Sequence, residues 1–183
     1  MLTNKLEVEA LSDLHVKLSY IENGGQVVRC HMVPTIKEQN VAAHSFGVAW
    51  WVYLLTKENK PTVNLLMAAL QHDLPEGVTG DIPAPTKRTL RCGLDLADWE
   101  VNLNTSAGLP AFETLLTECE TRILKLADSL ELLQLCLRER SMGNRTRQLG
   151  VMFENVKNYA REVSKTQLEA SIINNFVNQW ENS

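Results

Sequence analysis

Apolar residues recur at intervals of three to five positions along most of the chain, which is the spacing of one face of an α-helix. In the first segment these positions are Leu2, Leu6, Leu11, Leu14, Leu18 and Ile21. Asn23-Gly24-Gly25 follows, and glycine readily adopts the left-handed conformation found at helix C-termini. The first helix is therefore expected to end at these glycines.

Further segments show the same helical spacing. They are 41–57, 61–73, 88–104, 110–141, 146–163 and 167–181. Asn40 is expected to cap the first of these, and Pro61 to lie in the first turn of the next. Thr166 and Glu169 are expected to form a capping box at the last helix.

The long segment 110–141 is expected to turn one continuous apolar face to the core. Its members are Leu115, Leu116, Cys119, Ile123, Leu126, Leu130, Leu133 and Leu137. Two stretches, 26–39 and 73–87, contain prolines or β-branched residues and predict irregular connections. Because no segment alternates apolar and polar residues as a strand does, the sequence predicts an all-α bundle in one domain, residues 1–183.

Composition narrows the class of protein. The chain has 183 residues, of which 44% are hydrophobic and 22% charged, as in an ordinary globular protein. The sequence pI of about 5.6 argues against a protein that binds nucleic acid polymers, which needs a basic surface. The most apolar run, 41–55, is shorter than the roughly 20 residues that span a bilayer, so no membrane partner is expected.

The N-terminus lacks the basic and then apolar layout of a signal peptide. The four cysteines, Cys30, Cys92, Cys119 and Cys136, form no CxxC pair. Both features predict reduced thiols in a cytoplasmic protein.

Four polar residues interrupt the apolar pattern: His44, the pair His72-Asp73, and Asp128. A carboxylate among leucines is costly to bury unless a partner compensates its charge. Two imidazoles and two carboxylates from separate segments would share one divalent cation. Each residue alone has a plainer interpretation, such as a core histidine, or an ion pair between Asp128 and Lys125.

The surrounding motifs add specificity. The segments HSFGVAW, AALQHDLPEGVTGDIPAPTK and KLADSLELL resemble the HD-domain phosphohydrolases, and among them the bacterial 5′-deoxynucleotidase branch. The run VPTIKEQNVAAHS is similar to small phage HD proteins that release triphosphate from dATP. The resemblance, over about 25–140, implies a compact HD-domain helical bundle with a metal site between helices. It also implies His44, His72, Asp73 and Asp128 as ligands of one cobalt, zinc or manganese ion, with magnesium as an alternative.

The same resemblance implies that Glu76 and Asp81 serve the attacking water and the phosphate. Asp81 has a second interpretation as a cap within the loop. The residues expected to contact substrate are Arg29, Cys30, His31, Met32, Lys87 and Pro85, with Ile36 beside Met32. The branch often has tryptophan where this chain has Cys30, which predicts a different contact with the nucleoside.

The favoured reaction is hydrolysis of a deoxynucleoside triphosphate, dATP first, to deoxynucleoside and triphosphate. Release of orthophosphate from a deoxynucleoside monophosphate is the alternative, and a non-catalytic nucleotide-binding HD protein is a third reading. A homo-oligomer in the cytoplasm, the host's if phage-encoded, is expected.

Two further groups have open interpretations. Trp50 and Trp51 point about 100° apart on a helix, so one is expected in the core and the other at an interface. The four arginines of segment 138–147 are either a charged helix end or a patch that attracts triphosphate.

Overall fold

The computed structural model describes residues 2–56, 60–83, 86–87 and 96–183. Its helices are α1 (Leu2–Gln26), α2 (Val41–Thr56), α3 (Val63–Gln71), α4 (Glu76–Thr79), α6 (Leu96–Ser106), the 3₁₀ helix η1 (Phe112–Leu115), α7 (Glu118–Ser141), α8 (Arg147–Val163) and α9 (Gln167–Glu181). Extended pairing in this part of the chain is limited to one bridge between Val28 and Asn40. The predicted all-α fold is confirmed.

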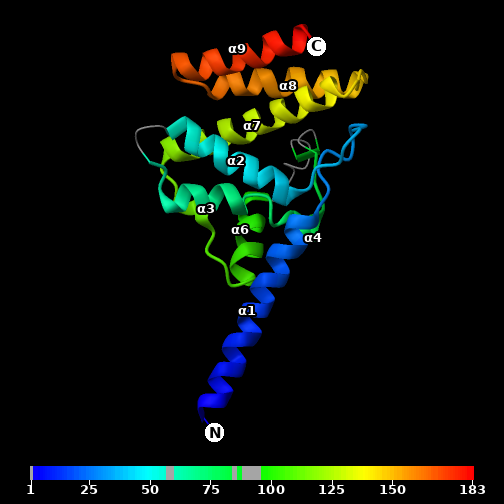
Figure 1. The fold of residues 1–183 in the computed structure, drawn as a ribbon. Helices are drawn as coiled ribbons and strands as arrows, with labels where there is room; N and C mark the ends of the chain where they lie inside the picture. The colour runs from blue at the N-terminus through cyan, green and yellow to red at the C-terminus, as the bar shows by residue number, and fades with distance from the viewer. Residues whose placement is uncertain (1, 57–59, 84–85, 88–95) are drawn as a thin grey trace.

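Helix α7 lies between two groups of helices (Figure 1). On one side it packs with α8 and α9 through Leu130, Leu133 and Phe153, and on the other with α2 and α3 through Val48 and Leu65. Each of these side chains is essentially excluded from solvent. Burial of one such side chain contributes about 1.5–3 kcal/mol, so α7 is the element that holds the two groups together.

Helix α1 ends at Gln26, one residue after the predicted glycines, but neither Gly24 nor Gly25 has the positive φ of a left-handed helix end. Gly24 and Gly25 are both buried where α1 meets α4 and α2. A Cβ at Gly24 would lie 2.6 Å from the carbonyl oxygen of Leu74, and one at Gly77 would lie 2.8 Å from the Gly24 nitrogen. These glycines allow two helices to approach closely, and they are not a helix stop.

The predicted helix 110–141 is also wrong at its start. The segment contains η1 and a separate α7, which Thr117 caps together with Glu120 in a capping box. Leu115 and Cys119 are exposed, so the buried face of α7 begins only after the first turn. The threonine and glutamate satisfy the free N–H groups at the helix start, which favours a new helix over a continuation.

Smaller differences affect the predicted connections. Thr62 caps α3, so Pro61 precedes the helix and does not lie in its first turn. Stretch 73–87 contains the short helix α4, and of the predicted 88–104 helix the described part begins at Leu96. Asn40 accepts the Ala43 N–H at 2.9 Å, and Thr166 with Glu169 forms the expected capping box. Those two caps are confirmed.

Other expectations concern the surface. The cysteines in the described ranges, Cys30, Cys119 and Cys136, are free thiols. Cys92 lies outside the described residues. In the described part of the chain, no helix is both long enough and apolar enough to cross a membrane. The N-terminal part of α1 projects away from the rest of the molecule (Figure 1).

Candidate metal centre

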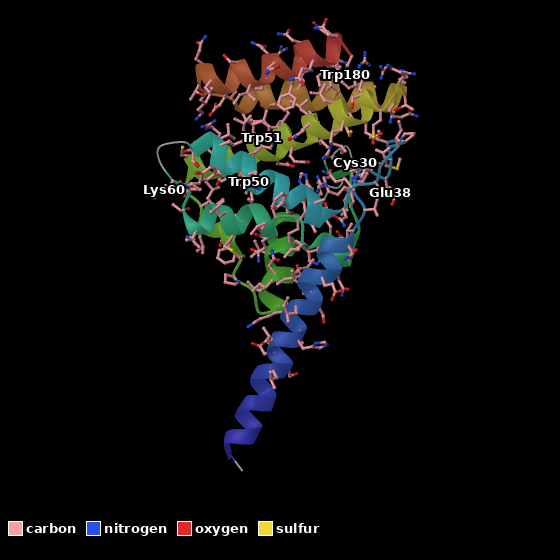
Figure 2. The ribbon with its side chains drawn as sticks, viewed as in Figure 1. Cys30, Glu38, Trp50, Trp51, Lys60 and Trp180 are labelled. Carbon is pink, nitrogen blue, oxygen red and sulfur yellow. The ribbon has the colours of Figure 1, made fainter. Side chains whose placement is uncertain are left out.

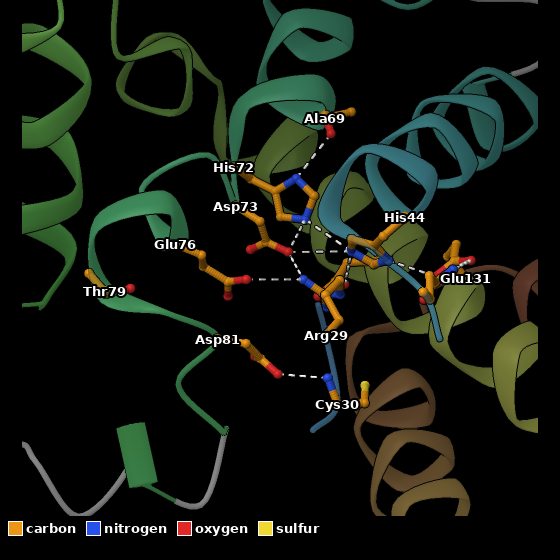
Figure 3. Close-up of polar contacts among 12 residues, drawn as sticks. Arg29, Cys30, His44, Ala69, His72, Asp73, Glu76, Thr79, Asp81 and Glu131 are labelled. Atoms are coloured by element: carbon orange, nitrogen blue, oxygen red, sulfur yellow. Dashed lines mark hydrogen bonds and ion pairs between the residues drawn. The ribbon is translucent and has the colours of Figure 1, made fainter. Parts of the chain in front are cut away.

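The two predicted histidines meet at one point. His44 lies in the second turn of α2, and His72 follows the last residue of α3. Their Nε2 atoms are 3.3 Å apart (Figure 3). His44 is fully buried and the side chain of His72 is 11% exposed, so both rings face the protein interior and each other.

The two predicted carboxylates join this pair. Asp128, in the middle of α7, places Oδ1 3.2 Å from the His44 Nε2 atom. Asp73 places Oδ2 3.5 Å from His44 Nε2 and 3.3 Å from His72 Nε2. Ligand atoms of His44, His72 and Asp128 all lie within 4.8 Å of one another. The structure thus brings together all four side chains that were predicted to share a cation.

Each histidine ring also makes a hydrogen bond through its Nδ1 atom, and this bond determines whether Nε2 carries a proton or a lone pair. His72 Nδ1 lies 3.0 Å from the Ala69 carbonyl oxygen, and His44 Nδ1 lies 2.6 Å from Glu131 Oε2. Both oxygens can only accept, so a neutral ring carries its proton on Nδ1. The Nε2 lone pair of His44 and that of His72 then face each other and two carboxylates, an arrangement that a divalent cation would stabilise.

The pKa values of the rings agree with a site of this kind. Burial lowers the pKa of His72 to about 3, so its ring is neutral at physiological pH. Burial acts in the same direction on His44, but hydrogen bonds to the carboxylates of Asp128 and Glu131 outweigh it and raise the pKa. A proton and a metal ion therefore compete for His44 Nε2.

Glu131 belongs to the site through its contact with His44, and it is not among the residues predicted from the sequence. It lies one helical turn after Asp128 on α7, and its side chain is only 4% exposed. The signal was present: a second acid at i+3 of Asp128, in a face otherwise made of leucines.

Arg29 and Glu76 are buried beside Asp73 (Figure 3). The guanidinium of Arg29 donates to Asp73 Oδ2, and its Nη1 is 3.9 Å from Glu76 Oε2. Burial raises the pKa of Glu76 to about 7. Arg29 Nε and Glu76 Oε2 are buried without a hydrogen-bond partner in the structure. Buried polar atoms are normally satisfied, so these two atoms indicate a place for a polar ligand.

Asp81 is separate from the histidines. Its Oδ2 accepts the Cys30 N–H at 2.6 Å and lies 3.4 Å from His31 Nδ1. Cys30 has a positive φ of 56°, which is uncommon for a residue other than glycine. Asp81 therefore binds the connection that carries Arg29, and this long-range contact differs from the predicted cap within its own loop.

The remaining predicted substrate contacts are more scattered. Met32 and Ile36 are exposed on the connection between α1 and α2. Lys87 Nζ pairs with Glu100 Oε1 on α6 at 3.3 Å, which draws it toward that helix. His31 is half-exposed, and Pro85 lies outside the described residues.

The arginines of segment 138–147 mostly have partners within the chain. Arg138 lies 3.6 Å from Glu131, Arg140 stacks on the Trp180 ring at 4.3 Å, and Arg145 donates to the Arg140 carbonyl. This favours the charged helix end over a patch for triphosphate.

Trp50 and Trp51 separate as predicted. Trp51 packs against the buried side chains on both sides of α7 and donates to Gln134. Trp50, in contrast, is 53% exposed (Figure 2). One tryptophan is therefore part of the core, and the interface role of the other stays a prediction.

Comparisons with known proteins agree with this geometry. Residues 26–107 match the model of the HD domain family. A curated dATP triphosphohydrolase of Acinetobacter phage SH-Ab 15497 is 32% identical over 126 residues, which is 58% of this chain. The chain spans 59% of the length of that relative.

Solved structures show the same fold at low identity. The PH0347 protein of Pyrococcus horikoshii OT3 superimposes with a TM-score of 0.70 at 19% identity, over 89% of this chain and 98% of that one. The HD phosphohydrolase DatZ of cyanophage S-2L, bound to dA and one catalytic Zn²⁺ ion, gives 0.60 at 19%, over 90% and 94%. An HD-domain phosphohydrolase of Listeria innocua gives 0.62 at 21%, over 90% and 86%.

Proposed function

We propose that this chain, which carries an HD domain at residues 26–107, is a metal-dependent phosphohydrolase of deoxynucleotides. The observation that supports this most directly is the convergence of two imidazoles and two carboxylates beside a buried arginine and a buried glutamate. Relatives and structural neighbours that are HD phosphohydrolases support a hydrolase. The favoured reaction converts a deoxynucleoside triphosphate and water to a deoxynucleoside and triphosphate.

His44, His72, Asp73 and Asp128 would hold the cation. Nitrogen and oxygen donors suit zinc, cobalt or manganese, and magnesium is the alternative. When bound, such an ion polarises a phosphoryl oxygen and lowers the pKa of a bound water. Arg29 donates to Asp73 Oδ2 in this structure; when Asp73 binds the cation, the planar guanidinium, including the unpartnered Nε, would be available to a phosphate.

Glu76 would accept the proton of the attacking water. Its carboxylate is buried, lies beside Arg29, and has a free Oε2 atom. A pKa near 7 suits a general base at neutral pH. Asp81 would chiefly hold the connection, because its Oδ2 atom accepts the Cys30 N–H.

The proposed substrate is dATP. The name of the phage relative and the dA bound to DatZ support a deoxyadenosine nucleotide. A deoxynucleoside monophosphate is the second candidate, because both reactions break the bond between the sugar oxygen and the α-phosphorus. The ion pair between Lys87 and Glu100 favours the monophosphate, because Lys87 would then not be available to the β- and γ-phosphates of a triphosphate.

The deciding experiment is a panel of dATP, dAMP and ATP, each with Co²⁺, Mn²⁺, Zn²⁺ or Mg²⁺, with products separated by chromatography. Triphosphate from dATP supports the favoured reaction, and orthophosphate from dAMP alone supports the second. Bound nucleotide without any product would support the non-catalytic reading. Equal turnover of ATP and dATP would contradict the preference for deoxyribose.

A homo-oligomer in a cytoplasm, and one domain over residues 1–183, remain part of the proposal. Phe46, Trp50 and Tyr53 form an exposed, edge-to-face aromatic row along α2. Aromatic residues are enriched at interfaces, which supports contact between copies through this row. Light scattering should give a mass above the 20.6 kDa of one chain, and a mass near 21 kDa would contradict the oligomer.

A further inference from the structure

The carboxylate of Glu131 faces away from the proposed cation, on the far side of the His44 ring (Figure 3). We infer that Glu131 is a positioning residue: it sets the tautomer of His44 and joins the metal site to the connection that carries Arg29. This inference rests on the proposed function, because it assigns the group that prepares one of the proposed ligands.

The two histidines are held by different kinds of acceptor. The backbone carbonyl of Ala69 serves His72, and no substitution removes it. A side chain serves His44: Glu131 Oε2 lies 2.6 Å from Nδ1, and both residues are buried. A charged acceptor on one ring nitrogen fixes the proton there and makes the other nitrogen a better ligand. A substitution of Glu131 can therefore test the role of the hydrogen bond to His44 Nδ1.

The second oxygen of Glu131 reaches the connection between α1 and α2. Gln39 Nε2 donates to Glu131 Oε1 at 2.7 Å, and the Gln39 carbonyl accepts the Arg29 N–H at 2.9 Å. One carboxylate therefore holds His44 on one side and, through Gln39, the backbone of Arg29 on the other. Movement of this carboxylate would shift the proposed cation site and the proposed phosphate contact together.

Close packing limits where this carboxylate can go. A Cβ at Gly47 of α2 would lie 2.6 Å from Glu131 Cγ, so α2 touches the stem of the side chain. Arg138 Nη2, on the solvent side, lies 3.6 Å from Oε1 and partly balances the charge. The side chain is confined by packing and by its three polar partners, as a positioning group must be.

The test compares Glu131→Ala, Glu131→Gln and Gln39→Ala with the wild type. Gln134→Ala is the matched control, since Gln134 lies one turn further along α7 and bonds only to Trp51 among the contacts described. Zn²⁺ affinity is measured by competition with a chromophoric chelator, and Co²⁺ absorption reports the coordination geometry. Thermal unfolding of the metal-free proteins reports stability separately.

Glu131→Ala should weaken Zn²⁺ binding by about 10–100-fold and alter the Co²⁺ spectrum. Glu131→Gln should lose less, because its amide oxygen still accepts the Nδ1 proton and Gln39 can turn its unpartnered Oε1 toward the new amide. Gln39→Ala should leave Zn²⁺ affinity nearly unchanged and raise KM for the nucleotide. Gln134→Ala should match the wild type in metal affinity and spectrum.

The inference is overturned if Glu131→Ala folds and keeps both the wild-type Zn²⁺ affinity and the wild-type Co²⁺ spectrum. If Glu131→Ala does not fold, the same result for Glu131→Gln overturns it. A wild-type protein that binds no stoichiometric Zn²⁺ or Co²⁺ overturns the proposed function as well, which separates the two failures.

Discussion

At the scale of single residues, the site depends on which atoms have no partner. Arg29 Nε and Glu76 Oε2 are buried and unsatisfied, whereas the neighbouring carboxylate of Asp81 is occupied by the backbone. Unsatisfied buried polar atoms cost free energy, and a bound phosphate and water would remove that cost. This difference distinguishes Glu76, the proposed base, from Asp81, whose Oδ2 atom already accepts a backbone N–H.

Glu76→Gln should retain Zn²⁺ binding and lower the rate by about 10²–10⁴-fold, because an amide cannot accept the proton of water. A base acts only when ionised, and burial raises the pKa of Glu76 to about 7. The wild-type rate should therefore fall as the pH drops below about 7, and the variant should lack this limb. Steady-state rates from pH 5 to 9 check both points. An unchanged rate for Glu76→Gln would remove Glu76 from the mechanism.

At the scale of elements, the crossing of α1 and α4 brings Arg29 to the site. The connection that carries Arg29 begins where α1 ends at Gln26, and the buried Gly24 sets how closely α1 approaches Leu74. The position of α1, and with it the start of the connection that carries Arg29, thus depends on Gly24 having no side chain.

Gly24→Ala should destabilise the protein by about 1–3 kcal/mol, because the new methyl group would meet backbone atoms that cannot rotate away. Gly150→Ala on α8 is the control, since a Cβ there meets no atom within 4 Å. That change should be neutral or stabilising by up to about 1 kcal/mol. Urea unfolding measures both. Equal effects at the two positions would contradict the close-approach argument.

The other end of the same connection is held by α7. Glu139 accepts the backbone N–H of Ile36 at 2.6 Å and of Lys37 at 3.0 Å, and the Asn144 amide at 2.8 Å. Burial disfavours the ionised acid, but these hydrogen bonds prevail and hold the pKa of Glu139 below its usual range. The ionised carboxylate therefore stabilises the folded state.

Glu139→Gln should cost about 1–3 kcal/mol at pH 7, because one of these donors loses its acceptor. A depressed pKa gives stability that is present above the unfolded pKa, about 4.3, and is lost as the pH falls through the lower folded pKa. The difference between wild type and variant should thus shrink below about pH 4.3. Urea unfolding at several pH values tests this, with the exposed Glu154→Gln as control. A difference independent of pH would contradict the role of the charge.

At the scale of the whole molecule, the four proposed ligands join three parts of the bundle. They come from α2, from the two residues that follow α3, and from α7. A cation bound by all four would link α7 to the side of the bundle that contains α2 and α3, at a second place besides the core. Ligands that bind only the folded state stabilise it in proportion to the logarithm of their concentration.

Zn²⁺ at one hundred times its Kd should therefore stabilise the wild type by about 2.7 kcal/mol, and a chelator should reverse the effect. His44→Ala and Asp73→Ala should lose this response along with activity. Thermal unfolding with and without Zn²⁺ measures it, and Lys157→Ala, which removes the ion pair with Glu154 on α8, is the control. The same Zn²⁺-dependent increase in His44→Ala would place the metal elsewhere.

The sequence by itself determined the features that depend on local spacing. Helical periodicity and capping residues predicted the helices that became α2, α8 and α9, and polar residues within apolar runs identified His44, His72, Asp73 and Asp128. These signals are local, because a helix repeats every 3.6 residues and a buried charge stands out from its neighbours.

Only the tertiary structure decided which groups meet across long separations. It paired Glu131 with His44, Glu139 with Ile36, Asp81 with Cys30 and Lys87 with Glu100. It also turned Gly24 from an expected helix stop into a contact between helices. The chain pattern reveals the chemical character of a residue, but the partner that satisfies a buried polar atom is chosen by packing of distant elements.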